Sequence, residues 1–500
     1  MQEIRKSFWD FIAIASASLI SIPLIIASES IQARYLGPAN YGQVALILSA
    51  ISLLYLFGLS WTYHAILRFG KEEFIQFNHL RITTSNLLIL ILGSVFITAS
   101  IFFVFKNPIL HFMEIKNLSF SWLIALGFLL ATGKAITLEI LKVIRLIKIQ
   151  SFLYRLAGKI FILTGILLLI FIFKKLNVIY LIITYLISDL LIIIIGLSFI
   201  KLEYLYPLQF DKKKFKKIFL YCFPLLFSSW STYVVDWIDV YIIKYYMTLQ
   251  DVGVYQAAYK ILRMLKSFWG MGLITILTPI IMVLKTKGEI NKIREIYLER
   301  LVPQLSFLTM LIISFIILTS NITLYWIYGD KFSQTILPFK ILIASHNFSV
   351  ITFSLLPIIT SFDMTKIMFY LGLSAGIINI VLDIILVPIF GINGAAISSL
   401  IVFSINPIIW FFYILRRFEV KRYLTLSFPV FLLLIMGFNI LISNYYLRAF
   451  VTILLLILAY IYSRKCQLFR SSDVSILNNI NIPYPIKKFL SKIILKLSVD

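Results

Sequence analysis

Three basic residues recur at a spacing of three within one long apolar stretch of the sequence. They are Lys260, Arg263 and Lys266, in GVYQAAYKILRMLKSFWG. If a helix begins at Gly253, a rise of 1.5 Å per residue places them roughly 10, 15 and 20 Å from its start. A spacing of three also keeps them on one broad face of that helix. Such a row of cations suits the binding of an anionic group within an apolar structure.

Two acidic residues on the preceding apolar stretch offer these cations another role. Asp236 and Asp239 lie three apart in VVDWIDVYIIK and would share a helix face. They could pair with Lys260 in a structural salt bridge, or carry a coupling proton or sodium ion. Partial snorkelling of the cations is a further alternative. The residue types leave a substrate cavity and a buried ion pair both open.

The first half of the chain carries a second set of charges within apolar stretches. Its cations are Lys134 and Lys159, and Glu139 and Asp189 are candidate counter-charges. These residue types are equally compatible with lining a wet cationic cavity and with forming buried pairs.

Arg34 lies between the first two apolar stretches, in ARYLGPANYG, close to Glu29. The dipeptide Gly37-Pro38 predicts a tight turn there, with a new helix after it. Arg34 could close this turn at the membrane interface. Alternatively, its planar guanidinium could donate to a phosphate at the mouth of a cavity.

The composition assigns the chain to the membrane. Of its 500 residues, 61% are hydrophobic and 14% are charged, which is more apolar side chain than a soluble core of this length can bury. A helix needs about 20 apolar residues to cross about 30 Å of hydrocarbon, and the sequence contains about fourteen such runs. The runs are continuous rather than alternating, so they predict helices and not a barrel. The predicted fold class is an all-α integral membrane protein.

The predicted spans follow these runs. Lys340 and Asp383 lie toward the outer ends of the tenth and eleventh spans, where we expect them at the membrane interface. In chain order, the spans cover residues 11–29, 42–62, 84–105, 120–142, 152–173, 178–200, 218–243, 255–284, 303–325, 336–361, 366–388, 391–414, 426–444 and 448–462.

Charge and composition also bound the function. Lys and Arg are concentrated in the loops on one side of the spans, which predicts that both termini are cytoplasmic. The net charge of +24 is spread over short loops, so it suits anionic lipid headgroups and excludes a nucleic-acid partner. Two cysteines and four scattered histidines predict no metal site, and no nucleotide-binding loop is present. We expect a transporter and not an enzyme, without a cofactor, and with H⁺ or Na⁺ coupling as an option.

A weak repeat relates the two halves of the chain. YLGPANYGQVALIL aligns without gaps with YMTLQDVGVYQAAY 211 residues later, pairing Tyr35 with Tyr246 and Gly42 with Gly253. Each segment follows the first span of a set of six, so both halves cross the membrane in the same sense. We predict an N-lobe, a basic linker, a C-lobe, two additional spans and an amphipathic basic tail on the inner leaflet. Their boundaries are residues 1–210, 211–217, 218–415, 416–463 and 464–500.

The order of three segments resembles a known family. ARYLGPANYG follows the first span, VDWIDVYIIKYYMTLQDVGVYQAAYKIL opens the second half, and VPIFGINGAA precedes the twelfth span. With the number of spans, they resemble the polysaccharide-type (Wzx-like) flippases of the multidrug/oligosaccharidyl-lipid/polysaccharide exporter (MOP) superfamily. The resemblance extends over nearly the whole chain.

This resemblance implies a two-lobed, V-shaped bundle with a central cationic cavity, like that of the MATE transporters. It implies transfer of an undecaprenyl-diphosphate-linked oligosaccharide to the outer leaflet of a bacterial plasma membrane, for O-antigen, capsule or a similar polymer. Lys260, Arg263 and Lys266, with Arg34, would recognise the diphosphate or acidic sugars. The expected partners are this glycan, membrane lipids, a polysaccharide polymerase and glycosyltransferases, and a monomer is expected.

Three other functions remain open. A cation-coupled multidrug exporter of the same superfamily would bind cationic drugs through acidic residues, whereas cations predominate within these spans. A parallel-repeat sugar transporter is expected to lack the last two spans. A membrane glycosyltransferase or polymerase would need a large polar loop with catalytic carboxylates, and the predicted loops are short.

Overall fold

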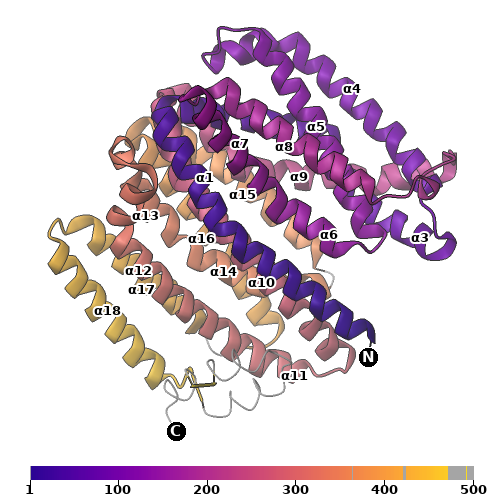
Figure 1. The fold of residues 1–500 in the computed structure, drawn as a ribbon. Coiled ribbons are helices and arrows are strands. Elements are labelled where there is room, and N and C mark those ends of the chain that lie inside the picture. Colours follow the sequence, from indigo (N-terminus) through magenta and orange to yellow (C-terminus); the bar gives the residue numbers. More distant parts are fainter. Residues whose placement is uncertain (1, 363, 421–423, 471–490, 493–500) are drawn as a thin grey trace. The chain divides into compact units, whose positions relative to one another are not determined.

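The computed structural model describes residues 2–362, 364–420, 424–470 and 491–492. This part of the chain is helical almost throughout and contains no strand (Figure 1). Thirteen of its helical stretches are long and apolar enough to cross a membrane. The prediction of an all-α integral membrane protein is therefore confirmed.

The membrane-crossing stretches coincide closely with the predicted spans, because in lipid a continuous apolar run satisfies its backbone groups only as a helix. In chain order, the stretches are Leu19–Ser60, Arg81–Phe112, Ser119–Val143, Ile147–Phe173, Val178–Ser198, Lys212–Tyr246, Leu249–Thr286, Ile290–Tyr328, Asp330–Ser361, Ile367–Phe390, Ile392–Arg417, Leu424–Leu441 and Tyr445–Lys465. The helices within them position the polar side chains. The longer ones are α1 (Gln2–Tyr55), α4 (Arg81–Phe112), α5 (Ser119–Val143), α7 (Gly158–Phe173), α8 (Val178–Ser198), α9 (Lys212–Tyr246), α10 (Leu249–Thr286), α12 (Val302–Tyr328), α13 (Ile336–Ala344), α14 (His346–Ser361), α15 (Thr365–Phe390), α16 (Ile392–Arg417), α17 (Ser427–Leu441) and α18 (Tyr445–Lys465).

The first stretch contains two of the predicted spans. Within α1, Gly37 has φ 70° and ψ 171°, which interrupts the helix immediately before Pro38. Tyr41 donates a hydrogen bond of 2.6 Å to Glu29, although twelve residues of unbroken helix would separate them by about 18 Å. The chain therefore folds back at Gly37, where the sequence predicted a tight turn. Dividing Leu19–Ser60 at this point gives fourteen spans among the described residues, the number expected.

The chain forms two compact units that combine distant segments. Unit 1 comprises Met1–Lys260, Leu324–Thr335 and Phe369–Ala395, and unit 2 comprises Ile261–Thr323, Ile336–Met368 and Ala396–Asp500. The predicted lobe boundaries, residues 1–210 and 218–415, stay a prediction.

Helices of the first half form most of unit 1. α5 packs along α8 and against α1, and α7 packs against both α1 and α8 (Figure 1). α9 packs against α4 and against the short π-helical segment Leu56–Ser60. These contacts bring together the helices that carry the predicted cations of the first half.

In unit 2, α17 and α18 pack side by side, and α13 packs against α17. Lys340 of α13 is only 5% exposed and donates a hydrogen bond of 3.2 Å to the carbonyl oxygen of Asn439. Lys340 is therefore held inside the protein, where the sequence had suggested the membrane interface. A backbone carbonyl supplies the acceptor that an interfacial lysine would find in water.

The predicted basic linker belongs to a helix. Asp211 caps α9, because its carboxylate accepts hydrogen bonds from the backbone amides of Lys213 and Lys214. The basic residues that follow form the first turns of α9. The amphipathic segment predicted in the tail, IKKFLSKIILKL, lies outside the described residues except for Ser491 and Lys492.

Two glycines that the repeat aligns mark a very close contact inside unit 1. A Cβ atom on Gly42 would lie 2.1 Å from the carbonyl oxygen of Leu249, and one on Gly253 would lie 1.9 Å from that of Pro38. The offset of 211 residues that relates the two glycines also relates Pro38 to Leu249. The contact is therefore reciprocal, as a two-fold relation between the two segments requires. This reciprocity supports the parallel repeat.

We expect Gly253→Ala to destabilise the protein, because the added methyl group would overlap a backbone oxygen of α1. Overpacking of this kind costs about 1–3 kcal/mol, which thermal unfolding in detergent would reveal as a drop of several degrees. Gly93→Ala on α4 is the matched control, since nothing lies within 4 Å of its Cβ position and alanine favours the helix. Equal unfolding temperatures for the two variants would contradict the close contact.

Candidate functional site

Charged side chains from five helices gather within unit 1. The cations are Lys134 on α5, Lys159 on α7 and Lys260 on α10, and the anions are Glu29 on α1 and Asp189 on α8. We call these five residues the lysine cluster. All of them lie within stretches that can cross a membrane. Three of the predicted substrate-binding cations are thus brought together from separate parts of the sequence.

Lys260 lies at one side of the lysine cluster. Its ammonium group pairs with the Glu29 carboxylate at 2.7 Å and lies 4.5 Å from the centre of the Tyr41 ring. Tyr41 donates to the same carboxylate at 2.6 Å. The counter-charge that the structure shows for Lys260 is therefore Glu29, where the sequence offered Asp236 or Asp239. The only sequence signal for Glu29 was its position next to a long apolar run.

Lys134 forms the second ion pair, with Asp189 at 2.6 Å. Both side chains are partly buried, so water screens the pair less than it would at a free surface. Asp189 thus takes the role of counter-charge that the sequence proposed. Glu139, the other candidate, instead pairs with Lys142 on its own helix at 2.5 Å. The spacing of three between these two residues makes that local pair available.

Lys159 differs from the other two lysines. It is partly buried, and it forms no hydrogen bond or ion pair within the described part of the chain. It lies close enough to Lys134, Asp189, Glu29 and Lys260 for their charges to act on it. Because two carboxylates face three ammonium groups, the lysine cluster carries an excess of one positive charge. Such a site favours an anion.

Arg34 is exposed at the turn that contains Gly37. Its guanidinium donates to the backbone carbonyl oxygens of Trp326 and Ile327, the second contact measuring 3.4 Å. These are C-terminal carbonyls of α12 within unit 1, which have no partners inside their own helix. The contact ties the segment before the Gly37 turn to the end of α12. The two alternatives that the sequence offered for Arg34, turn closure and phosphate binding, stay predictions.

The other two cations of the predicted row belong to unit 2. Arg263 and Lys266 continue α10 and are both partly buried. The ammonium group of Lys266 lies 2.9 Å from the centre of the Phe403 ring on α16, a cation–π contact. The helix predicted for the row is confirmed, and its joint role in substrate binding stays a prediction.

A second polar cluster in unit 1 contains two buried carboxylates. Asp239 on α9 is 2% exposed and Asp383 on α15 is 0% exposed. The side-chain amide of Asn379 bridges them, donating to Asp239 at 3.3 Å and to Asp383 at 3.2 Å. Tyr255 also donates to Asp239. Asp383 is therefore buried among helices, which corrects the interfacial position expected for it.

Two buried carboxylates this close are stable together only if a basic side chain, a proton or another cation compensates their charge. For Asp239 the sequence left a structural salt bridge and ion coupling both open, and Asn379, 140 residues away in the sequence, joins it together with Asp383. Asp236, the other predicted residue, accepts a hydrogen bond of 3.3 Å from Tyr259.

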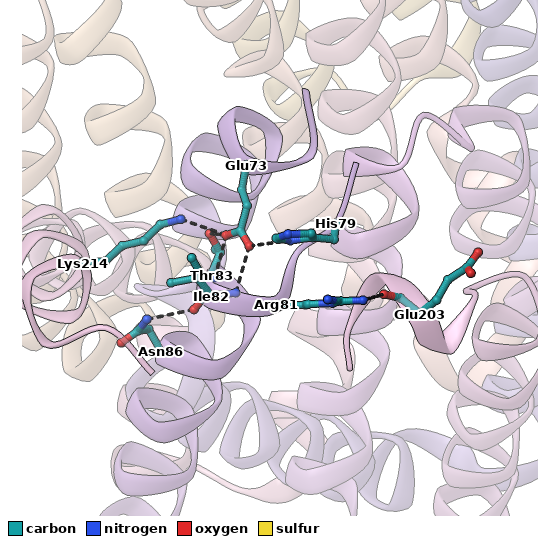
Figure 2. Close-up of polar contacts among 8 residues, drawn as sticks. All are labelled: Glu73, His79, Arg81, Ile82, Thr83, Asn86, Glu203 and Lys214. Atoms are coloured by element: carbon teal, nitrogen blue, oxygen red, sulfur yellow. Dashed lines mark hydrogen bonds and ion pairs between the residues drawn. The ribbon is translucent and has the colours of Figure 1, made fainter. Parts of the chain in front are cut away.

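A third polar cluster surrounds Glu73 on the short helix α3 (Lys71–Phe77), outside the membrane-crossing stretches (Figure 2). One carboxylate oxygen accepts from the Ile82 amide at 2.9 Å and lies 3.2 Å from the ring of His79. The other accepts from the amide and hydroxyl of Thr83 at 2.8 and 2.6 Å and from Lys214 at 2.8 Å. Glu73 thus caps the first turn of α4 and ties it to the first turn of α9.

These contacts keep the Glu73 carboxylate ionised although it is almost fully buried. Burial raises the pKa of a carboxyl group, but the hydrogen bonds from Lys214 and Thr83 outweigh it and lower the pKa of Glu73. Beside it, Arg81 donates to the backbone carbonyl oxygen of Glu203 at 3.3 Å (Figure 2). The cluster therefore fixes the segment around residue 203 and the start of α9 to α4.

The fold defines a polytopic helical membrane protein. A family model described as "Polysaccharide biosynthesis protein" matches residues 9–284, which is more than half of the chain. The chain therefore belongs to this family, as the sequence resemblance predicted.

One curated relative is the probable low-salt glycan biosynthesis flippase Agl15 of Haloferax volcanii, 20% identical over 209 residues. This match covers 42% of the chain and 44% of the relative, so the chain spans less than half of that relative's length.

Two solved structures share the fold. The lipid II flippase MurJ in an inward closed conformation has a TM-score of 0.65 at 18% identity, covering 90% of this chain and 97% of that one. An inward-facing multidrug resistance MATE family transporter of the MOP superfamily has a TM-score of 0.64 at 16% identity, covering 81% and 98%. The matched proteins are transporters and flippases, which agrees with the prediction of a transporter and not an enzyme.

We expect Glu73→Gln to lower the unfolding free energy by about 2–4 kcal/mol at neutral pH. The substitution leaves Lys214 without its counter-charge, and it puts an NH2 group, which donates hydrogen bonds, where a carboxylate oxygen accepted them. The difference from wild type should persist above the ordinary glutamate pKa of about 4.3 and shrink as the pH falls below it, because the unfolded chain then takes up its proton before the native carboxyl group, whose pKa is lowered. Thermal unfolding in detergent across pH measures both effects. Glu72→Gln is the matched control, since Glu72 is exposed. Equal losses in the two variants would refute the capping role of Glu73.

Proposed function

We propose that the protein flips an undecaprenyl-diphosphate-linked oligosaccharide from the cytoplasmic to the outer leaflet of a bacterial plasma membrane, for O-antigen, capsule or a similar polymer. The observation that carries this proposal is the lysine cluster, with its excess positive charge among membrane-crossing helices. The family match and the glycan flippase relative support a lipid-linked glycan as substrate. Both termini would then be cytoplasmic. Glycosyltransferases would act before this step, and a polymerase would act after it.

The physical requirements of flipping fit such a cluster. A diphosphate headgroup must cross hydrocarbon, where a bare anion is very costly, while its polyprenyl tail remains in lipid. Cations within the spans replace the water that the headgroup loses. No covalent step is needed, because transport requires only different affinities in two conformations of the protein.

Within this proposal, Lys159 is the first residue to meet the diphosphate. Lys134 and Lys260 already face carboxylates at 2.6 and 2.7 Å, so an incoming anion must compete with Asp189 and Glu29 for them. Lys159 has no such competitor in the described part of the chain. Arg263, Lys266 and Arg34 remain proposed contacts for other parts of the headgroup.

A coupling ion belongs in the cluster of Asp239 and Asp383. Either carboxylate can carry a proton, and the carboxylate oxygens and the amide oxygen of Asn379 are suitable ligands for a sodium ion. Release of that ion would change the charge of the cluster and so favour another conformation of the protein. An ion gradient could in this way supply the energy for an otherwise reversible flip.

One observation favours a second candidate function. Buried carboxylates could also bind a cationic drug, and the fold matches a multidrug MATE transporter. A cation-coupled exporter of this kind would depend on Asp239 and Asp383 but would tolerate loss of Lys159. The following experiment therefore separates the two functions.

We expect Lys159→Gln to reduce export of the lipid-linked glycan at least tenfold, because it removes the excess positive charge of the lysine cluster. Surface glycan would be measured in a deletion strain complemented with the variant, together with the amount of protein in the membrane. Lys148→Gln is the matched control, since Lys148 is exposed on the short helix Ile147–Ser151. Wild-type export by the Lys159 variant would count against the proposed role of the cluster.

We expect Asp239→Asn to abolish the dependence of flipping on an imposed H⁺ or Na⁺ gradient, because a neutral amide cannot hold the compensating ion. The assay is headgroup translocation in vesicles with and without each gradient. Asp330→Asn is the control, since Asp330 is exposed. An unaltered gradient response in the Asp239 variant would remove the ion site from the mechanism.

A further inference from the structure

One buried side-chain amide beside the lysine cluster has a nitrogen atom without a hydrogen-bond partner in the described part of the chain. Gln32 on α1 is 0% exposed. Its side-chain oxygen accepts a hydrogen bond of 3.0 Å from the Tyr185 hydroxyl on α8. Its side-chain nitrogen has no hydrogen-bond partner among the described residues. Because Tyr185 fixes the oxygen, the two N–H groups are directed away from it.

The place of Gln32 relates it to the proposed substrate site. Gln32 follows Glu29 by three residues, so both side chains lie on one face of α1. Tyr185 precedes Asp189 by four residues and shares a face of α8 with it in the same way. Tyr185 also lies close enough to Glu29 for that charge to act on it. The amide therefore borders the lysine cluster on the side of the Gly37 turn.

An unpaired amide has a cost that an apolar residue would avoid. Burying N–H groups without an acceptor costs about 1–3 kcal/mol, and methionine has nearly the same length and shape without this cost. Buried polar groups without partners are rare and call for a ligand or another specific explanation. The chemistry of this group is that of a neutral donor, which suits a neutral oxygen acceptor. The charged ammonium groups next to the Gln32 amide bind phosphate oxygens more strongly than a neutral amide does.

We propose that Gln32, oriented by Tyr185, donates a hydrogen bond to an oxygen of the sugar attached directly to the diphosphate. This inference rests on the proposed function, since it places the diphosphate at Lys159 and the first sugar toward the Gly37 turn. The lysines then bind the charge that all such lipids share. Gln32 distinguishes a lipid that carries a sugar from one that does not.

Binding to two probes tests this division of roles. The full chain would be placed in lipid nanodiscs and titrated with polyprenyl diphosphate and with the same lipid carrying one N-acetylhexosamine. We expect Gln32→Met to weaken binding of the sugar-bearing lipid about tenfold and to leave the bare diphosphate unchanged. Loss of one hydrogen bond that leaves no new charge accounts for that factor. The unfolding temperature should change little, because the variant removes the unpaired donors but also the oxygen that accepts from Tyr185.

Tyr185→Phe tests the orientation of the amide without altering Gln32. It should weaken binding of the sugar-bearing lipid by a smaller factor and leave the bare lipid unaffected, because the freed amide samples other orientations. Tyr180→Phe is the matched control, since Tyr180 is on the same helix and its ring stacks on Phe173 instead. This variant should bind both lipids like the wild type.

Each result decides between distinct conclusions. Equal weakening of both lipids would mean that the amide contacts the diphosphate, and unchanged binding in Gln32→Met would mean that the amide contacts no ligand. Either result overturns the inference but leaves the proposed function intact. A wild-type chain that binds neither lipid would instead refute the proposed function itself.

Discussion

Compensation of charge in a medium without water is the constraint on which the structure of this protein depends. An isolated ammonium or carboxylate group among membrane-crossing helices is too costly to persist, so each must meet an opposite charge, a hydrogen-bond donor or acceptor, or a ligand. Lys260 meets Glu29 and Lys134 meets Asp189. Lys340, with a backbone carbonyl as its acceptor, shows the same constraint in unit 2. The packing of helices from distant parts of the chain is what makes these pairs possible.

The three polar clusters of unit 1 differ in how completely this compensation is achieved. Around Glu73, donors saturate both oxygens, and the result is a fixed joint between α3, α4 and α9. Asp239 and Asp383 accept hydrogen bonds from the neutral side chains of Tyr255 and Asn379. The lysine cluster has an excess of positive charge. The saturated cluster around Glu73 is structural, whereas the excess charge of the lysine cluster gives an anion a physical reason to bind.

The sequence predicted the spans well because each is determined locally, by the length of one apolar run and the thickness of the bilayer. The Gly37 turn was predictable for a similar reason, since glycine followed by proline restricts the backbone at that point. Partners of the buried charges were not predictable in this way. Glu29 and Lys260 are 231 residues apart, and only the packing of α1 on α10 brings them together. Glu139, offered as one of two possible counter-charges, pairs instead with Lys142, which lies three residues away on the same helix.

The reciprocal contact between Gly42 and Gly253 has a meaning for the origin of the chain. Because each of the two segments contacts the other through equivalent atoms, two identical chains could make the same contact about a two-fold axis. A shorter ancestral polypeptide, with one set of spans inserted in a single orientation, would then have assembled as a homodimer. Gene duplication and fusion would join the two subunits, free each to change independently, and so permit the unequal charges that the two halves now carry.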